Sequence, residues 1–198
     1  HGIALDTDED IVQCDPDKLD MLVLPGGMPG TTNLAACEKL TEALKKIPGL
    51  TLEFPTKTGV VAVLKGVQPG PVLALRADID ALPIQEETGL PYASTVPGVM
   101  HACGHDIHTS VMLGAALLLK EREATLPGRV RILFQPAEEN FGGAKTLIRA
   151  GALEGVSAIF GMHNEPSLPL GEFATRGGAF YANVDRFVFK VTGKGAHA

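Results

Sequence analysis

Short apolar runs alternate with amphipathic segments along most of this chain, and this alternation restricts its fold more than any other feature. Two segments carry apolar residues at helical spacing, 106–120 and 143–150. Four runs have the length and composition of buried strands: 59–64, 71–77, 129–135 and 157–162. Because strands and helices that alternate in this way pack as a sheet between helical layers, we expect a three-layer α/β fold with a mainly parallel sheet.

The connections are short and rich in turn-forming residues. We expect the strands at 59–64 and 71–77 to be neighbours joined by a turn at 68–70. The second of these strands should lie inside the sheet, because it is apolar on both faces. Nearer the N-terminus, 20–24 is predicted to be a buried strand and 33–46 a helix.

Composition excludes several classes of function. The net charge is −6, and the 17 basic residues form no run, so we expect no nucleic-acid partner. No apolar stretch reaches the length that spans a membrane. The three cysteines are an odd and widely spaced set, which indicates a reducing cytoplasm rather than a disulfide framework.

Polar clusters follow the predicted strands at the points where the strands end. Asp78 and Asp80 follow one strand, the clusters at 136–139 and 161–166 follow two others, and 100–108 opens a helix. In sheets of this kind, functional residues gather at the carboxyl ends of the strands. Thiolate, imidazole and carboxylate groups are ligands of zinc and manganese, so together these clusters predict a metal site.

The spacing within the clusters suits such a site. Cys103 and His105 can turn toward one ion because Gly104 makes the chain between them flexible. Asp106 could hold a ligating imidazole in place. Of two adjacent glutamates, Glu138 and Glu139, one can bind metal while the other accepts a proton from the attacking water and returns it to the departing amine.

Each of these residues has a simpler interpretation when taken singly. A lone cysteine is usually a small core residue, a Glu-Glu pair is usually solvated, and His163 alone could be a hydrogen-bonded residue at a strand end. Their joint placement after strands favours the site. For His101 and His108 the alternatives stay open: each is either a member of the site or only a residue that supports a ligand or lies at the surface.

At these clusters the chain resembles the amidohydrolase branch of the aminoacylase and carboxypeptidase G family of metallopeptidases. That branch includes hippurate hydrolases, indole-acetyl-amino-acid hydrolases and N-acetyl-diaminopimelate deacetylases. The similarity runs from about Gly49 to the last residue and covers the segments 57–62 and 75–83 as well as the three clusters.

The resemblance implies an enzyme that hydrolyses the amide bond of N-acyl amino acids with one or two divalent metal ions, zinc or manganese. The implied metal ligands are Cys103, His105, Glu139 and His163. Glu138 would be the general base and acid, and Asp78 would support the ligands. The residue matching His197 would reach a substrate bound to a partner subunit, which implies a homo-oligomer.

Two departures from the family limit what the resemblance implies. The family's catalytic domain resumes after a lid domain and donates a last histidine ligand, so we expect that ligand and the late strands to be missing here. In addition, the first 45 or so residues resemble a ThiJ/PfpI-class fragment, chiefly through Leu22-Val23-Leu24-Pro25-Gly26-Gly27. That class uses a reactive cysteine on an elbow, whereas Cys37 falls within the predicted helix.

We therefore expect a chimeric organisation in three parts. Residues 1–46 would be the ThiJ/PfpI-like segment, 47–185 the metallopeptidase-like core, and 186–198 the start of a truncated lid domain. Strands are expected at 173–175 and 187–191. Two alternatives to the hydrolase remain: a fusion that folds or assembles without turnover, and a ThiJ-like thiol protein.

Overall fold

The computed structural model describes residues 38–140, 142–182 and 187–195. The chain divides into two units, His1–Asn164 and Glu165–Ala198, and every described helix and strand belongs to the first. The strand expected at 20–24 lies outside the described residues, as does the first part of the helix expected at 33–46.

The described elements agree closely with the predicted segments. A 3-10 turn, η2, at Glu123–Thr125 links α3 to β4. In chain order the helices and strands are α2 Glu38–Lys45, β1 Thr51–Glu53, β2 Val60–Lys65, β3 Gln68–Asp78, α3 His105–Glu121, β4 Pro127–Gln135, α4 Gly143–Arg149 and β5 Val156–Gly161.

The strands form one mixed sheet in the order β1-β2-β4-β3-β5. β3 pairs in parallel with β4 and with β5, so it lies inside the sheet as its apolar sequence predicted. β2 is antiparallel to both β1 and β4. The α/β class is therefore confirmed, and the parallel part of the sheet is β4, β3 and β5.

The prediction that β2 and β3 are neighbours is wrong, because β4 lies between them. The residues expected to form a turn, 68–70, are the start of β3. Glycines make this arrangement possible. The N–H of Gly66 donates to the carbonyl of Gly128 at 2.9 Å, and a Cβ on Gly128 would lie only 1.9 Å from the carbonyl oxygen of Pro71. The beginning of β4 thus fits between the two strands only because no side chain is present there.

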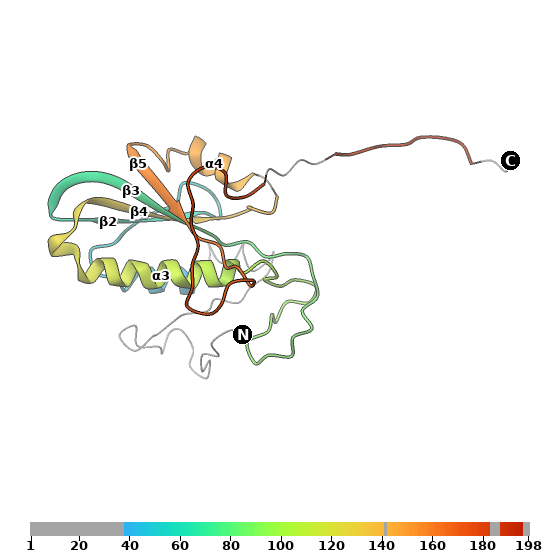
Figure 1. Cartoon of the computed structure of the whole chain (residues 1–198), viewed down its shortest axis with the longest axis horizontal. Helices are drawn as coiled ribbons and strands as arrows, with labels where there is room; N and C mark the ends of the chain where they lie inside the picture. Colours follow the sequence, from blue (N-terminus) through green and yellow to red (C-terminus); the bar gives the residue numbers. More distant parts are fainter. Residues whose placement is uncertain (1–37, 141, 183–186, 196–198) are drawn as a thin grey trace. The chain divides into compact units, whose positions relative to one another are not determined.

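Helices cover both faces of the sheet, α3 on one and α4 on the other (Figure 1). Along β4, successive side chains alternate between the two cores. Ile132 and Phe134 pack with Leu113 of α3, whereas Leu133 packs with Leu147 of α4. This alternation confirms the predicted three layers.

The prediction of strands at 173–175 and 187–191 is wrong. Both segments are described, and neither carries a strand. Apolar alternation gives a strand only where another strand supplies backbone partners. Here the side chains are almost fully accessible: Phe189 is 88% exposed and Val191 is 94% exposed.

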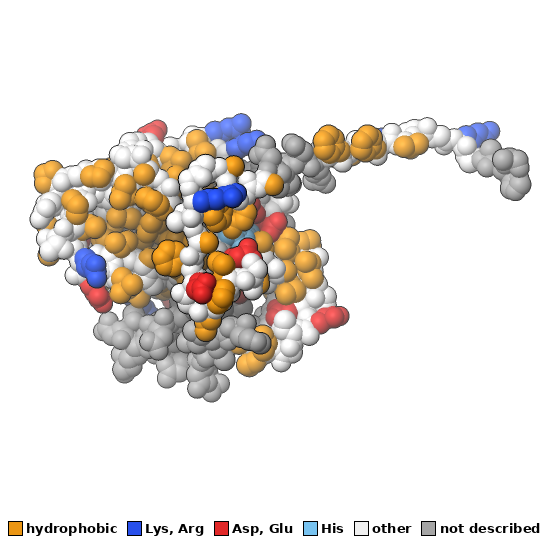
Figure 2. All heavy atoms as spheres, viewed as in Figure 1, with side chains coloured by type: hydrophobic (Ala, Val, Ile, Leu, Met, Phe, Trp, Pro, Cys, Tyr) orange, Lys and Arg blue, Asp and Glu red, His pale blue; other side chains and the backbone are white. Residues whose placement is uncertain are grey.

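Apolar side chains also remain exposed at one edge of the sheet. β5 pairs with β3 alone among the described strands. Ile159 and Phe160 of β5 are about half exposed, and hydrophobic side chains gather on the face seen in Figure 2. Within the described residues, no helix has both the length and the apolar character required to cross a membrane.

Among the described residues, Phe134 is the largest fully buried side chain. Replacing it with alanine (Phe134→Ala) is expected to lower the free energy of unfolding by about 3–5 kcal/mol, because the substitution leaves a cavity between the sheet and α3. Urea denaturation measures this change. Leu118→Ala, on the exposed side of α3, is the matched control and should change stability by less than about 1 kcal/mol. Equal effects of the two changes would contradict the described core.

Candidate metal centre

The three parallel strands end at one edge of the sheet, and the predicted site residues lie there. Asp78 is the last residue of β3, Glu138 and Glu139 follow β4, and His163 follows β5. His105 is the first residue of α3, which begins at the same edge. Residues that are up to 85 positions apart in the chain therefore meet because parallel strands point the same way.

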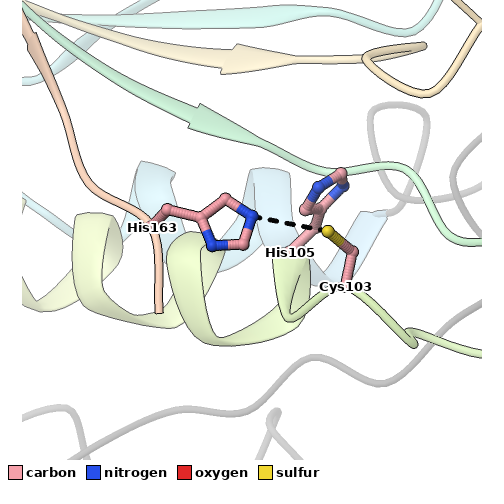
Figure 3. Close-up of side chains that lie close together, drawn as sticks. All are labelled: Cys103, His105 and His163. Atoms are coloured by element: carbon pink, nitrogen blue, oxygen red, sulfur yellow. Dashed lines mark hydrogen bonds between the residues drawn. The ribbon is translucent and has the colours of Figure 1, made fainter. Parts of the chain in front are cut away.

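Cys103, His105 and His163 lie close together (Figure 3). The Sγ atom of Cys103 is 3.4 Å from Nε2 of His163. One ligand atom from each of the three residues lies within 4.8 Å of the other two. Gly104 adopts a left-handed conformation, with φ of 96°, and this turn separates Cys103 from the first residue of the helix.

His105 is buried, yet only one of its ring nitrogens has a hydrogen-bond partner. Nδ1 lies 2.7 Å from the carbonyl oxygen of Asp80, and because a carbonyl can only accept, Nδ1 carries the proton. Nε2 is buried without a hydrogen bond and lies 3.5 Å from Oδ2 of Asp78 and 3.9 Å from Oε1 of Glu139. In the neutral ring the lone pair of Nε2 therefore lies among potential metal ligands, as a ligating histidine requires.

His163 is set in the same tautomer. Its Nδ1–H donates to the carbonyl oxygen of Asn164 at 2.7 Å. The lone pair therefore belongs to Nε2, the nitrogen that faces Cys103. Both imidazoles expected to bind metal present the same ring nitrogen to the centre.

A strained turn positions the two glutamates after β4. Ala137 has a φ of 53°, which is unusual for a residue other than glycine. Its carbonyl accepts the N–H of Gly143 at 3.1 Å, so the start of α4 holds the turn. Glu138 and Glu139 then form a third group of possible ligands with His105.

Asp80 connects this turn to the start of α3. Its Oδ2 accepts the backbone N–H of Glu139 at 3.0 Å, and its Oδ1 lies 3.4 Å from Nδ1 of His105. Burial by itself would raise the pKa of Asp80, but the nearby ring of His105 and the hydrogen bonds from the backbone of the glutamates outweigh burial and lower it. Asp80 is therefore held as a carboxylate.

Asp78 is buried between a cation and an imidazole. Arg76 Nη1 lies 2.7 Å from its Oδ2, and Nδ1 of His108 lies 2.5 Å from its Oδ1. Burial would raise the pKa of Asp78, but the hydrogen bond from His108 and the charge of Arg76 together lower it. This position fits the expectation that Asp78 supports the ligands.

The expectations for the other candidate residues have different outcomes. Asp80, not Asp106, holds the imidazole of His105, and the charge of Asp106 acts on His101 instead. His108 is fully buried, so the surface alternative for it is excluded, and both ring nitrogens of His101 are buried as well. His197 lies outside the described residues.

Sequence reasoning missed the roles of Asp80, His108 and Asn164 in this arrangement. A signal for His108 was present, because residues three apart on a helix share a face and His105 is its partner at that spacing. Asp80 was noted only as following a strand. Nothing in the sequence marks Asn164 apart from its place next to His163.

The comparisons with known proteins agree with this fold. A model of peptidase family M20/M25/M40 matches residues 74–193. The N-acetylcysteine deacetylase of Bacillus subtilis (strain 168) is 59% identical over 142 residues, which is 72% of this chain and 37% of the relative. The N-acyl-L-amino acid amidohydrolase of Geobacillus stearothermophilus is 47% identical over 157 residues, or 79% of this chain and 42% of the relative.

A solved structure shows the same relationship. The Bacillus subtilis YXEP protein, described as a dinuclear metal binding peptidase from the M20 family, has a TM-score of 0.66 and 53% sequence identity. The match covers 69% of this chain and 38% of that chain.

The fold and the histidine–carboxylate cluster at its carboxyl edge define an α/β chain of the metallopeptidase type. Because the family model matches more than half of its residues, the chain belongs to peptidase family M20/M25/M40. It spans roughly two fifths or less of the length of the relatives named above.

In metal-free protein, Cys103 is expected to react slowly with iodoacetamide near neutral pH. Burial and then the charge and hydrogen bond of Glu139 raise the pKa of this thiol to about 11. Its thiolate fraction is therefore about two orders of magnitude below that of an ordinary cysteine with a pKa of ~8.5. Peptide-resolved labelling in native buffer and in urea measures the difference, and equal rates in both would contradict the described surroundings of Cys103.

Proposed function

We propose that this chain carries the metal-binding part of an enzyme that hydrolyses the amide bond of N-acyl amino acids. The relatives named as a deacetylase and an amidohydrolase of such compounds support this substrate class. The observation that carries the proposal is the buried Nε2 of His105, which has no hydrogen bond and faces a cysteine, a second histidine and a glutamate.

The donor set suits one or two divalent ions, zinc or manganese. A thiol and imidazoles favour zinc, and a carboxylate suits manganese as well. The proposed ligands are Cys103, His105, Glu139 and His163. The solved relative described as dinuclear supports a site for two ions. A bound ion would polarise the amide carbonyl.

Glu138 is the proposed proton carrier. Burial raises its pKa, and the negative charges of Glu139 and Asp78 raise it further. A carboxylate with a raised pKa is a better proton acceptor near neutral pH than an ordinary glutamate. It would accept a proton from the attacking water and deliver it to the departing amine, while Glu139 remains available as a ligand.

Metal titration tests the ligand set. The chain is expected to bind Mn²⁺ or Zn²⁺, and Cys103→Ala and Glu139→Ala should each weaken binding by at least about tenfold, because each removes one donor. Isothermal titration calorimetry measures the affinity. Ser110→Ala is the matched control, since its hydroxyl donates to the carbonyl of Asp106 in its own helix, away from the proposed ligands. Unchanged metal binding in both ligand variants would refute the site.

Turnover tests the chemistry separately. If the chain is active alone, release of acetate from N-acetylcysteine should fall at least about a hundredfold in Glu138→Gln, which keeps the shape of the side chain but cannot accept the proton. The same variant should retain metal. Metal binding without any turnover by the unaltered chain would favour the alternative of a fusion that folds without activity.

We also infer a homo-oligomer in a reducing compartment such as the cytoplasm. The exposed apolar side chains of β5 support self-association, because β5 has only one partner strand among the described residues and burial of such an edge stabilises an assembly. Light scattering after size exclusion should therefore give a mass above that of one chain, and Phe160→Glu should lower it. Leu118→Glu, which alters an exposed leucine on α3, should leave the mass unchanged.

A further inference from the structure

Two histidines lie three residues apart on α3, both fully buried, and they differ in how their nitrogens are used. His105 leaves Nε2 without a hydrogen bond. His108 has partners for both nitrogens, since Nδ1 lies 2.5 Å from Asp78 and Nε2 lies 3.1 Å from the backbone nitrogen of Asn164. One ring therefore has a lone pair to offer and the other has none.

His108 is tied to Asp78 and to Asn164 through its two ring nitrogens. A carboxylate only accepts, so Nδ1 of His108 carries a proton and donates it to Asp78. Nε2 lies 2.8 Å from Oδ1 of Asn164, which only accepts, and 3.1 Å from its backbone nitrogen, which only donates. Whichever of these two contacts Nε2 makes as a hydrogen bond, its partner is Asn164.

Asn164 in turn sets the orientation of the imidazole of His163, the residue before it. The carbonyl of Asn164 accepts Nδ1–H of His163, which turns the other nitrogen toward Cys103. The ring of His163 also packs against His108, with a centroid separation of 4.6 Å. A chain of contacts thus runs from the end of β3 through α3 to the segment after β5.

Gly104 leaves the space that this segment occupies. A Cβ at Gly104 would lie 2.1 Å from Oδ1 of Asn164, far inside any allowed contact. The turn that begins α3 and the segment that follows β5 are therefore in direct contact. Little room remains for the segment to shift away from His108.

We infer that His108 is a positioning residue, which holds the segment His163–Asn164 against Asp78 and thereby directs the imidazole of His163 at the metal centre. The inference rests on the proposed function, because it takes His163 as a ligand. Asp78, His105 and His108 are themselves close enough to hold an ion. However, both nitrogens of His108 are engaged, so His108 organises the site without binding metal.

The test compares two substitutions at His108, each of which places an amide group at the position of one ring nitrogen and leaves the other position empty. The amide of His108→Gln can reach the position of Nε2 and, because it has both a donor and an acceptor, can bond either Oδ1 or the N–H of Asn164. The amide of His108→Asn matches only the position of Nδ1 and leaves Asn164 without this partner. Calorimetry with Mn²⁺ should show a Kd raised at least about tenfold for His108→Asn and less than about threefold for His108→Gln.

Thermal unfolding of the metal-free variants separates positioning from a general loss of stability. Both variants should lower Tm, and His108→Gln at least as much as His108→Asn, because it loses the bond to the carboxylate of Asp78 and bonds to charged groups are the stronger ones. Ser110→Ala, on the same helix, should leave the Mn²⁺ affinity unchanged. Equal affinities for the two His108 variants would overturn the inference. The inference would also be overturned if a His108 variant bound one Mn²⁺ ion fewer per chain and kept its affinity for any remaining ion. That result would make His108 a ligand.

Hydrogen exchange of the Asn164 amide tests the same contact without metal. The amide should be protected in the unaltered chain and in His108→Gln, and should exchange at least about tenfold faster in His108→Asn. If the unaltered chain binds no Mn²⁺, the proposed function fails, but this measurement still decides the role of His108. Equal exchange in all three proteins would refute it.

Discussion

The arrangement of the candidate site depends on one contact, between the end of β3 and the first residue of α3. The carbonyl of Asp80 accepts the proton of His105 Nδ1, and the side chain of Asp80 accepts the backbone N–H of Glu139. A single residue after β3 thus orients both the helix that begins with His105 and the turn that carries the glutamates. The strand provides a rigid support because it is paired on both sides within the sheet.

Buried charge of this density is costly unless each group has a partner. Asp78 is compensated by Arg76 and His108, and Asp80 by His105 and backbone donors. The exceptions are informative, because Nε2 of His105 and Oδ1 of Asp80 are buried without hydrogen bonds. Each such atom costs ~1–3 kcal/mol. A cation bound at Nε2 would offset part of this cost, so binding and stability would be linked.

The helices predicted at 106–120 and 143–150 and the strands predicted at 59–64, 71–77, 129–135 and 157–162 were confirmed, and the family model confirmed the resemblance. Hydrophobic spacing located α3 and β4 to within a few residues, because their apolar side chains pack into the two cores. It also located β5, although most residues of that strand are exposed. The motifs around Cys103, Glu138 and His163 also identified the family, since they are ordered and specific. By contrast, apolar alternation at 187–191 was misleading, because the described tail offers those residues no strand to pair with.

By itself, the sequence determined the local elements, the chemical types of the donors and their placement after strands. Strand order was decided only by tertiary structure, because β4 enters between β2 and β3 through close contacts at glycines that no local pattern reveals. Tertiary structure also decided which residue forms the hydrogen bond that orients each histidine. Asp80 rather than Asp106 meets His105, and His108 meets Asn164, 56 positions away. Hydrogen bonds depend on distance and direction in space, and these are fixed only when the sheet and helices pack.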